Sequence, residues 1–331
     1  MQAILIRETG GAEVLTLELL PEPEIATATQ IKVALKAAGV NPIDTKLRSR
    51  GVFTPNGLPA ILGCDGAGVV VETGPEANRF REGDEVWFCH GGLGGLQGNY
   101  AEFAVLEESV CCRKPASIDF LHAAAAPLVL ITAWEALFGR ARLAEGQTLL
   151  VHAGAGGVGH VAIQLAKQVG ARVVTTTSSP EKAEFVRSLG ADEVIDYRKR
   201  DFVEAVLEIT GGRGADVVLE SVGPEIFRRS ILATAHYGDL VTLLDPGSDV
   251  DWKEARLRNL RVGFTLMLTP MLRDLPQARD DQVAILSNCA EFIDSGSLKI
   301  SLAGSLPLAQ AAEAHRIIEQ GHIQGKLVLI P

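Results

Sequence analysis

Three glycines at the spacing G-x-G-x-x-G form the clearest chemical signal, in the segment Gly154–Gly159. An apolar strand pattern ending near His152 precedes this segment, and an amphipathic helical pattern from Val158 to Val169 follows it. In such a unit the first glycine allows the tight turn, the second lets the backbone approach a pyrophosphate, and the third permits close packing of helix on strand. The helix N-terminus adds amide donors and a positive dipole end. We therefore expect a dinucleotide site rather than a purely structural turn, formed by Gly154, Ala155, Gly156, Gly157, Val158 and Gly159.

The end of the next predicted strand, Arg172–Thr177, indicates which dinucleotide is bound. An NAD site normally places Asp or Glu about 20 residues after the glycines, where it accepts a hydrogen bond from the ribose 2′-hydroxyl. Here Ser178 and Ser179 follow the strand, no carboxylate is present, and Lys182 comes next. Hydroxyls and an ammonium can bind a 2′-phosphate, which a carboxylate would repel. We expect NADPH rather than NADH, although the serines can also cap the following helix.

The elements that must position these residues change in character along the chain. In the first third, short β-rich runs separated by turn signals such as Asn41-Pro42 and Gly83-Asp84 predict a compact barrel or sandwich. From residue 148 onward apolar strands alternate with helices, which predicts a parallel sheet covered on both faces. The segment after residue 260 is too short for a third domain, so we expect it to return to the first.

Length and composition exclude several classes of protein. The 331 residues correspond to about two domains. A net charge of −10 without a Lys/Arg-rich run argues against nucleic-acid binding. Five cysteines, an odd number with scattered spacing, do not form a disulfide framework. The longest apolar stretch, near Ala123–Trp134, is far below the roughly 20 residues that span a bilayer. We expect a cytoplasmic protein that binds no membrane.

Several further motifs occur in one order from end to end of the chain: Ala38–Asp44, Gly63–Val70, Gly83–Val86, Gly190–Tyr197 and Gly325–Val328. Together with the glycine motif they resemble the medium-chain dehydrogenase/reductase superfamily, and within it the zinc-free quinone oxidoreductases. The resemblance implies an α/β protein with a GroES-like β-rich catalytic domain from residues 1–122 and 268–331. It implies a Rossmann domain, a doubly wound parallel sheet, from residues 123–267. It also implies a homodimer, formed through the edge strand near Leu260–Leu268.

The resemblance separates this chain from the zinc-dependent members of the superfamily. Those members hold a catalytic metal with a Cys, a His and a third Cys or acidic ligand. At the three corresponding places this chain has residues of other types: Asn41, Cys64 and Leu128. Zinc needs three or four convergent N, S or O ligands, so we expect no bound metal. The alternative is a makeshift zinc site built from four nearby residues: Cys64, Asp65, Cys89 and His90.

The expected loss of the metal constrains the reaction. Hydride transfer to an isolated ketone places charge on one oxygen, which a Lewis acid stabilises by several kcal/mol. A quinone or an α,β-unsaturated carbonyl spreads the charge by conjugation, so hydrogen-bond donors and good positioning suffice. We therefore expect NADPH-dependent reduction of quinones. The alternatives are an NADPH-dependent reductase of enone or alkenal double bonds, a cofactor-binding protein without turnover, and a zinc alcohol dehydrogenase.

The resemblance also implies roles for residues outside the glycine motif. Asn41 lies beside the nicotinamide, where it donates to a substrate oxygen or holds the carboxamide, and Thr132 lies near the same ring. Lys182 and Tyr197 flank the phosphate end of the adenosine, and Lys326 reaches the cofactor. Four of these residues also have a structural alternative. Asn41 could only form an Asn-Pro turn, and Thr132 could be a hydroxyl inside a helix. Tyr197 could be an aromatic at a strand end, and Lys326 could be a solvated surface lysine.

Two more residues are candidates for the substrate pocket. Phe53 stands where some members of the family carry a tyrosine, and because it cannot donate a proton, water is left as a proton source. His90 precedes the glycine-rich run 91–98 and is expected to contact substrate. Asp44 either orients the turn at Asn41 or only caps the following helix.

Overall fold

The structure, a computed structural model, describes all 331 residues, and the chain folds into two compact units. The terminal unit comprises Met1–Leu128, Leu268–Gly296 and Ile300–Pro331, and the central unit comprises Val129–Met267 and Ser297–Lys299. The first boundary lies after residue 128 rather than after the expected 122, because helix α2 (Phe120–Ala125) packs on strands β3 (Gln30–Val40) and β5 (Asp65–Thr73). The Asp119 side chain caps α2 by accepting from the His122 N–H.

The central unit contains a six-stranded parallel sheet with the strand order β11-β10-β9-β12-β13-β14. The strands are β9 (Thr148–Val151), β10 (Arg172–Thr177), β11 (Glu193–Asp196), β12 (Ala215–Glu220), β13 (Thr234–Thr242) and β14 (Arg261–Phe264). The chain runs outward from β9 to β11 and then continues on the other side at β12. Such a change of direction opens a crevice at the carboxyl ends of the strands. The predicted doubly wound sheet is confirmed.

One helix precedes β9 and further helices connect the strands, and several of them begin at caps that the sequence offers. The helices are α3 (Pro127–Trp134), α4 (Gly157–Gln168), α5 (Pro180–Ser188), α6 (Phe202–Ile209), α7 (Pro224–Ala233) and α8 (Trp252–Leu257). Side chains of Ser179, Asp201 and Asp251 accept backbone hydrogen bonds at the starts of α5, α6 and α8. After α3 the chain continues as a π-helix, Glu135–Arg140.

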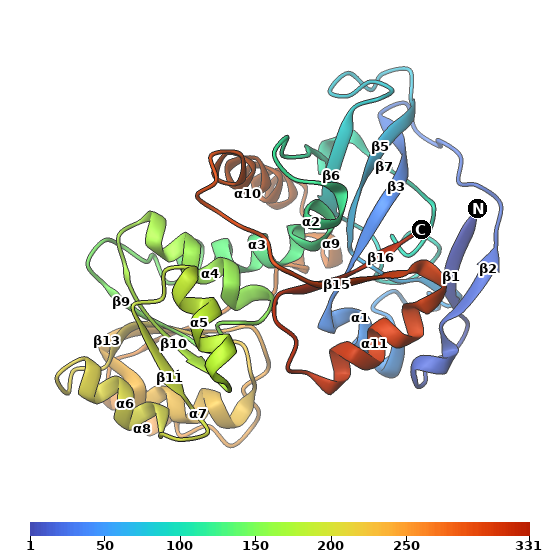
Figure 1. The fold of residues 1–331 in the computed structure, drawn as a ribbon. Coiled ribbons are helices and arrows are strands. Elements are labelled where there is room, and N and C mark those ends of the chain that lie inside the picture. The colour runs from blue at the N-terminus through green and yellow to red at the C-terminus, as the bar shows by residue number, and fades with distance from the viewer. The chain divides into compact units, whose positions relative to one another are not determined.

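The terminal unit is built on two sheets. A seven-stranded sheet has the order β15-β16-β3-β5-β6-β8 with β7 also paired to β3, and a three-stranded sheet has the order β2-β1-β4. The remaining strands are β1 (Gln2–Ile6), β2 (Thr16–Leu19), β4 (Ala60–Ile61), β6 (Glu85–Cys89), β7 (Phe103–Glu107), β8 (Cys112–Arg113), β15 (Leu302–Pro307) and β16 (Lys326–Ile330). Figure 1 shows the red β16 beside the blue β3, so the C-terminal segment does return to the first domain.

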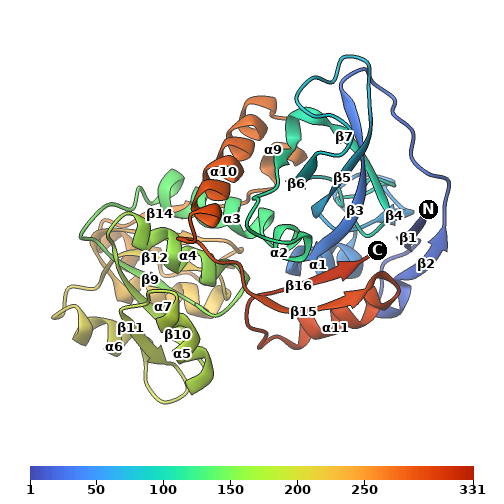
Figure 2. The same cartoon turned by 45° about the horizontal axis from the view of Figure 1, so that its top comes forward.

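The helices of the terminal unit are α1 (Pro42–Arg50), α2, α9 (Thr269–Leu272), α10 (Pro276–Asp294) and α11 (Ala311–Gln320). Figures 1 and 2 both show α11 beside β15 and β16.

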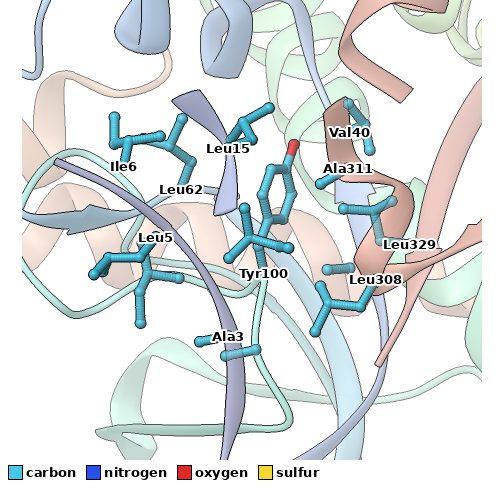
Figure 3. Packing of buried hydrophobic residues seen from close by; sticks show 14 of the residues in the cluster. Ala3, Leu5, Ile6, Leu15, Val40, Leu62, Tyr100, Leu308, Ala311 and Leu329 are labelled. Carbon is cyan, nitrogen blue, oxygen red and sulfur yellow. The ribbon is translucent and has the colours of Figure 1, made fainter. Parts of the chain in front are cut away.

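The ring of Tyr100 is fully buried among apolar side chains such as Leu62 and Leu308 (Figure 3). The Tyr100 carbonyl accepts a hydrogen bond from the Ile4 N–H, and the Tyr100 N–H donates to the Leu62 carbonyl, so its main chain is held beside β1 before β7 begins. None of the helices is long and apolar enough to cross a membrane.

Candidate active site

The glycine turn lies between β9 and α4, and its three glycines have different local roles. A Cβ on Gly154 would lie 2.0 Å from Thr175 Oγ1, and one on Gly159 would lie 2.4 Å from the Ala153 carbonyl oxygen. A Cβ on Gly156 would meet only that carbonyl, at 3.2 Å, so this face of the turn is open. Ala153, which directly precedes Gly154, has a φ of 53° and so makes the left-handed step of the turn. The turn is thus tightly packed on one side and open where a pyrophosphate must approach.

A cavity of about 530 Å³ opens beside this turn in the central unit. It is lined at the carboxyl ends of the strands by His152 after β9, Thr176 in β10, Tyr197 after β11 and Val222 after β12. This is the crevice where the strand order changes direction, and its size suits the nucleoside end of a dinucleotide. Tyr197 is 48% exposed and forms part of the wall.

At the end of β10, one hydroxyl group caps the next helix and another has no hydrogen-bond partner. Ser179 Oγ accepts a hydrogen bond of 3.3 Å from the Lys182 backbone N–H, so Ser179 does cap α5. Ser178 is buried. Thr177 Oγ1, which the sequence analysis did not single out, is also buried and has no hydrogen-bond partner. An unsatisfied buried hydroxyl is costly, and a ligand that bonds it at this strand end would remove that cost.

Some of the cations around the cavity form ion pairs with carboxylates, and others do not. Lys199 Nζ lies 3.3 Å from Asp196 Oδ2, while Arg200 pairs with Glu208 and Arg229 with Asp201. Neither Lys182 nor Arg198 forms an ion pair with a carboxylate. Burial lowers the pKa of Lys182, and the guanidinium of Arg198 lowers it further, so each of these two cations feels the charge of the other. They form an uncompensated positive site at the ends of β10 and β11.

Sequence reasoning named Lys182 but missed Arg198. The available signal was the basic run Arg198-Lys199-Arg200 directly after Tyr197. The run does not by itself tell which cation stays free, because Glu208, the carboxylate that neutralises Arg200, comes from the next helix, α6.

In the terminal unit, Asn41 is fully buried at the junction of β3 and α1. Its Nδ2 donates to Asp65 Oδ2 at 2.9 Å, and its Oδ1 accepts from the ammonium of Lys326. The Asn41 backbone N–H donates to Asp44 Oδ2 at 2.8 Å, and Asp65 Oδ1 accepts from the Leu128 N–H at 2.8 Å. The strand register that sets Leu327 opposite Val40 brings Lys326 to Asn41.

Burial controls the electrostatics of this cluster. It raises the pKa of Asp44 to about 7, against the hydrogen bonds from Asn41 N–H and Tyr100 O–H. Burial also raises the pKa of Asp65 and lowers that of Lys326, whose opposite charges lie 3.9 Å apart and partly offset both effects. Two carboxyl groups therefore face a single ammonium, and protonation of Asp44 near neutral pH balances the charge.

Lys326 does not behave as a surface lysine. It is 3% exposed, and its Nζ donates to the Val40 carbonyl at 3.1 Å as well as to Asn41. The alternative of a solvated surface lysine is therefore wrong.

Phe53, His90 and Thr132 complete the set of predicted site residues. Phe53 is 47% exposed, and its N–H donates to the Leu93 carbonyl in the glycine-rich run. Burial lowers the pKa of His90 to about 4, with help from Arg279, so this imidazole is neutral at pH 7, and its Nδ1 has no partner. Thr132 is buried within α3 of the central unit.

Comparisons with known proteins agree with this architecture. Residues 27–116 match the alcohol dehydrogenase GroES-like domain, and residues 189–329 match a family described as zinc-binding dehydrogenase. A quinone oxidoreductase of Pseudomonas aeruginosa is 35% identical over 322 residues, which cover 97% of each chain. An NADPH-dependent alkenal/one oxidoreductase of Arabidopsis thaliana chloroplasts is 35% identical over 341 residues, covering 100% of this chain and 80% of the other. The crystal structure of Escherichia coli quinone oxidoreductase complexed with NADPH superimposes with a TM-score of 0.89 at 31% identity and full coverage of both chains.

The name of the second family implies zinc, but the donor set of this chain does not fit it. The Asn41 amide oxygen is bound to an ammonium, and Leu128 has no side-chain donor. Burial raises the pKa of the Cys64 and Cys89 thiols well above the ordinary value, which opposes the thiolate form that binds zinc. No three His, Cys, Asp or Glu side chains are grouped as metal ligands.

Proposed function

Because the chain belongs to the quinone oxidoreductase family of the medium-chain dehydrogenase/reductase superfamily, we propose that it is an NADPH-dependent reductase of quinones. The observation that carries the choice of cofactor is the uncompensated pair Lys182 and Arg198 beside the nucleotide cavity. A 2′-phosphate supplies the negative charge that this pair lacks, and an NADH ribose does not.

The residues of the central unit fit this cofactor. The open face at Gly156 and the amides at the start of α4 suit the pyrophosphate, and the cavity at Tyr197 suits the adenosine. Ser178, Ser179 and the unpartnered Thr177 hydroxyl lie at the end of the strand that leads to the 2′-phosphate site. When bound, NADPH supplies the hydride.

At the nicotinamide end we propose Asn41 and Thr132 as the contacting residues. Asn41 can donate the amide hydrogen that Asp65 does not use, and it holds an acceptor oxygen or the carboxamide in place. Phe53 and the neutral His90 are proposed to line the acceptor pocket. These groups offer hydrogen bonds and shape but no cation at the acceptor oxygen, which favours an acceptor that delocalises charge.

A second candidate function is the reduction of alkenal or enone double bonds. The Arabidopsis relative is named an alkenal/one oxidoreductase, and at 35% it is as identical to this chain as the Pseudomonas quinone oxidoreductase. An enone is conjugated as a quinone is, so the same donors serve both. The two functions share the cofactor and the fold and differ only in the acceptor.

The test is a matrix of initial rates. NADPH and NADH are each oxidised against a quinone, an enone, an alkenal and a saturated aldehyde. We expect NADPH with the quinone to give the highest kcat/KM, and saturated aldehydes to give the lowest. Highest activity with the enone or alkenal would favour the second function, and a preference for saturated aldehydes or NADH would overturn the proposal.

We also propose that the protein is a homodimer. Strand β14 lies at the edge of the central sheet, and Phe264 and Leu266 near its end are 56% and 50% exposed. A second copy that adds its own β14 would continue the sheet and cover these side chains.

A further inference from the structure

We propose that Lys326 is a positioning residue that fixes and polarises the Asn41 carboxamide, so that one amide hydrogen is presented to the acceptor. The inference rests on the proposed function, because it concerns the group that would hold the acceptor or the nicotinamide. The Lys326 ammonium donates to Asn41 and to the Val40 carbonyl, so its proposed role acts through Asn41, in place of the direct contact with the cofactor that the resemblance implies.

The orientation of the Asn41 amide is set by two opposite charges. Its oxygen faces the Lys326 ammonium, and its nitrogen faces the Asp65 carboxylate at 2.9 Å. A flipped amide would place NH₂ against an ammonium and a carbonyl oxygen against a carboxylate, and both contacts are repulsive. The pair therefore specifies a single orientation for a side chain whose two ends have almost the same shape.

This orientation leaves one donor unused. An amide nitrogen carries two hydrogens, and Asp65 accepts one of them. The Asn41 oxygen is occupied by Lys326 and the backbone N–H by Asp44, so the second Nδ2 hydrogen is the remaining polar contact that this residue can offer.

The charge on Lys326 also changes the strength of that donor. A cation on an amide oxygen draws electron density from the nitrogen, because hydrogen bonds in a chain polarise one another, most strongly where water is excluded. Lys326 and Asn41 are 3% and 0% exposed, so water does not screen the effect. Val40 O and Asp65, at 3.1 and 3.9 Å from Nζ, hold the ammonium in place.

The test compares four proteins: wild type, Lys326→Met, Lys326→Arg and the double variant Lys326→Met/Asp65→Asn. In Lys326→Met we expect kcat with a quinone to fall about tenfold or more, since a charged hydrogen bond is lost, while the Kd for NADPH stays within about twofold. Lys326→Arg keeps the charge and should recover part of kcat. The matched control is Lys36→Met, which removes an exposed lysine from the same sheet and should leave kcat unchanged.

The double variant separates positioning from stability. Lys326→Met alone leaves Asp65 buried without its partner, so its Tm should drop. Removing both charges should restore Tm but leave kcat low. A double variant that regains the wild-type kcat would overturn the proposal, as would a folded Lys326→Met with unchanged kcat.

A readout without cofactor or substrate completes the test. The side-chain amide resonances of Asn41, assigned by their loss in Asn41→Asp, report its hydrogen bonds in the apoprotein. We expect them to shift in Lys326→Met and to remain in place in Lys36→Met, and unchanged resonances would contradict the proposal. If the wild type oxidised no NADPH with any quinone, the proposed function would fail, and this amide measurement would still decide the role of Lys326.

Discussion

At the scale of single residues, the nucleotide site depends on which cations remain free. Arg198 and Lys182 feel each other's charge and have no carboxylate partner, whereas Lys199 is paired with Asp196. In Arg198→Ala we expect the Kd for NADPH to rise about tenfold, because a charge-assisted bond to the 2′-phosphate is lost, while the Kd for NADH changes little. Fluorescence titration of both nucleotides measures this difference.

The matched control is Lys199→Ala, which removes a neighbouring cation that Asp196 already neutralises. It should change the Kd for NADPH much less than Arg198→Ala does. Equal losses in both variants would mean that the whole basic run acts through general electrostatics and that Arg198 has no special role.

Asp44 predicts a pH dependence of stability. Its pKa is about 7 in the folded protein and 3.8 as its ordinary value, so between these values the folded state binds a proton that the unfolded state has released. The contribution of Asp44 is therefore present at low pH and is lost as pH rises from about 4 to about 7, by up to roughly 4 kcal/mol. Above pH 7 it no longer changes.

Asp44→Asn removes this titration and retains an oxygen that can accept from Asn41 N–H and Tyr100 O–H. The difference in unfolding free energy between the variant and the wild type should therefore grow from pH 4 to pH 7 in the variant's favour. Urea unfolding at a series of pH values measures it. Parallel stability curves would show that Asp44 is ionised throughout.

The sequence predicted which residues belong to the candidate sites better than it predicted which side chains bond to one another. Asn41, Lys182 and Lys326 were all named, but the bond between Lys326 and Asn41 joins positions 285 residues apart. It depends on the register of β16 against β3, which no local pattern specifies. The same reason explains why Arg198 was missed, because its lack of a counterion depends on carboxylates in other elements.

At the scale of elements, the turn before α4 makes a prediction about its glycines. In Gly159→Ala the new Cβ would lie 2.4 Å from the Ala153 carbonyl, so the protein should lose about 1–3 kcal/mol of stability. In Gly156→Ala the nearest atom is 3.2 Å away, so Tm should change little while the Kd for NADPH rises. Thermal unfolding and nucleotide titration of both variants provide the comparison. A Gly156→Ala protein with unchanged Kd would show that the open face does not receive the pyrophosphate.

Periodicity predicted most elements of the central unit because each is short, apolar and bounded by a cap or turn. Periodicity did not predict the local backbone conformation where tertiary contacts determine it. The π-helix Glu135–Arg140 follows α3 without a signal in the sequence. The left-handed step of the glycine turn falls on Ala153, a residue that ordinarily avoids that conformation.

At the scale of the whole molecule, the exposed edge at β14 predicts self-association. Phe264 is 56% exposed and Leu266 50% exposed, so charges there should not disturb the folded monomer. The double variant Phe264→Asp/Leu266→Asp should shift the protein from dimer to monomer, because a desolvated carboxylate would face its copy across the interface. Light scattering measures the mass. A wild type that is monomeric at all concentrations would contradict the proposal.

The division of the chain was predicted from a change in pattern near residue 120 and from the short C-terminal tail. The structure assigns Ser297–Lys299 to the central unit, which the sequence did not indicate. This assignment follows from two hydrogen bonds between the main chain of Lys299 and helix α4. The Lys299 carbonyl accepts from Gln164 Nε2 at 2.9 Å, and the Lys299 N–H donates to Gln164 Oε1 at 2.8 Å. One buried glutamine on α4 thus holds a remote segment, and no sequence spacing predicts such a contact.

The most direct test of the proposed activity is the ratio of kcat/KM for a quinone to that for a saturated aldehyde, both measured with NADPH on protein dialysed against a chelator. The proposed reductase should reduce the quinone after this treatment with a ratio far above one. A ratio below one, or quinone reduction that is lost on chelation and returns with added zinc, would contradict it.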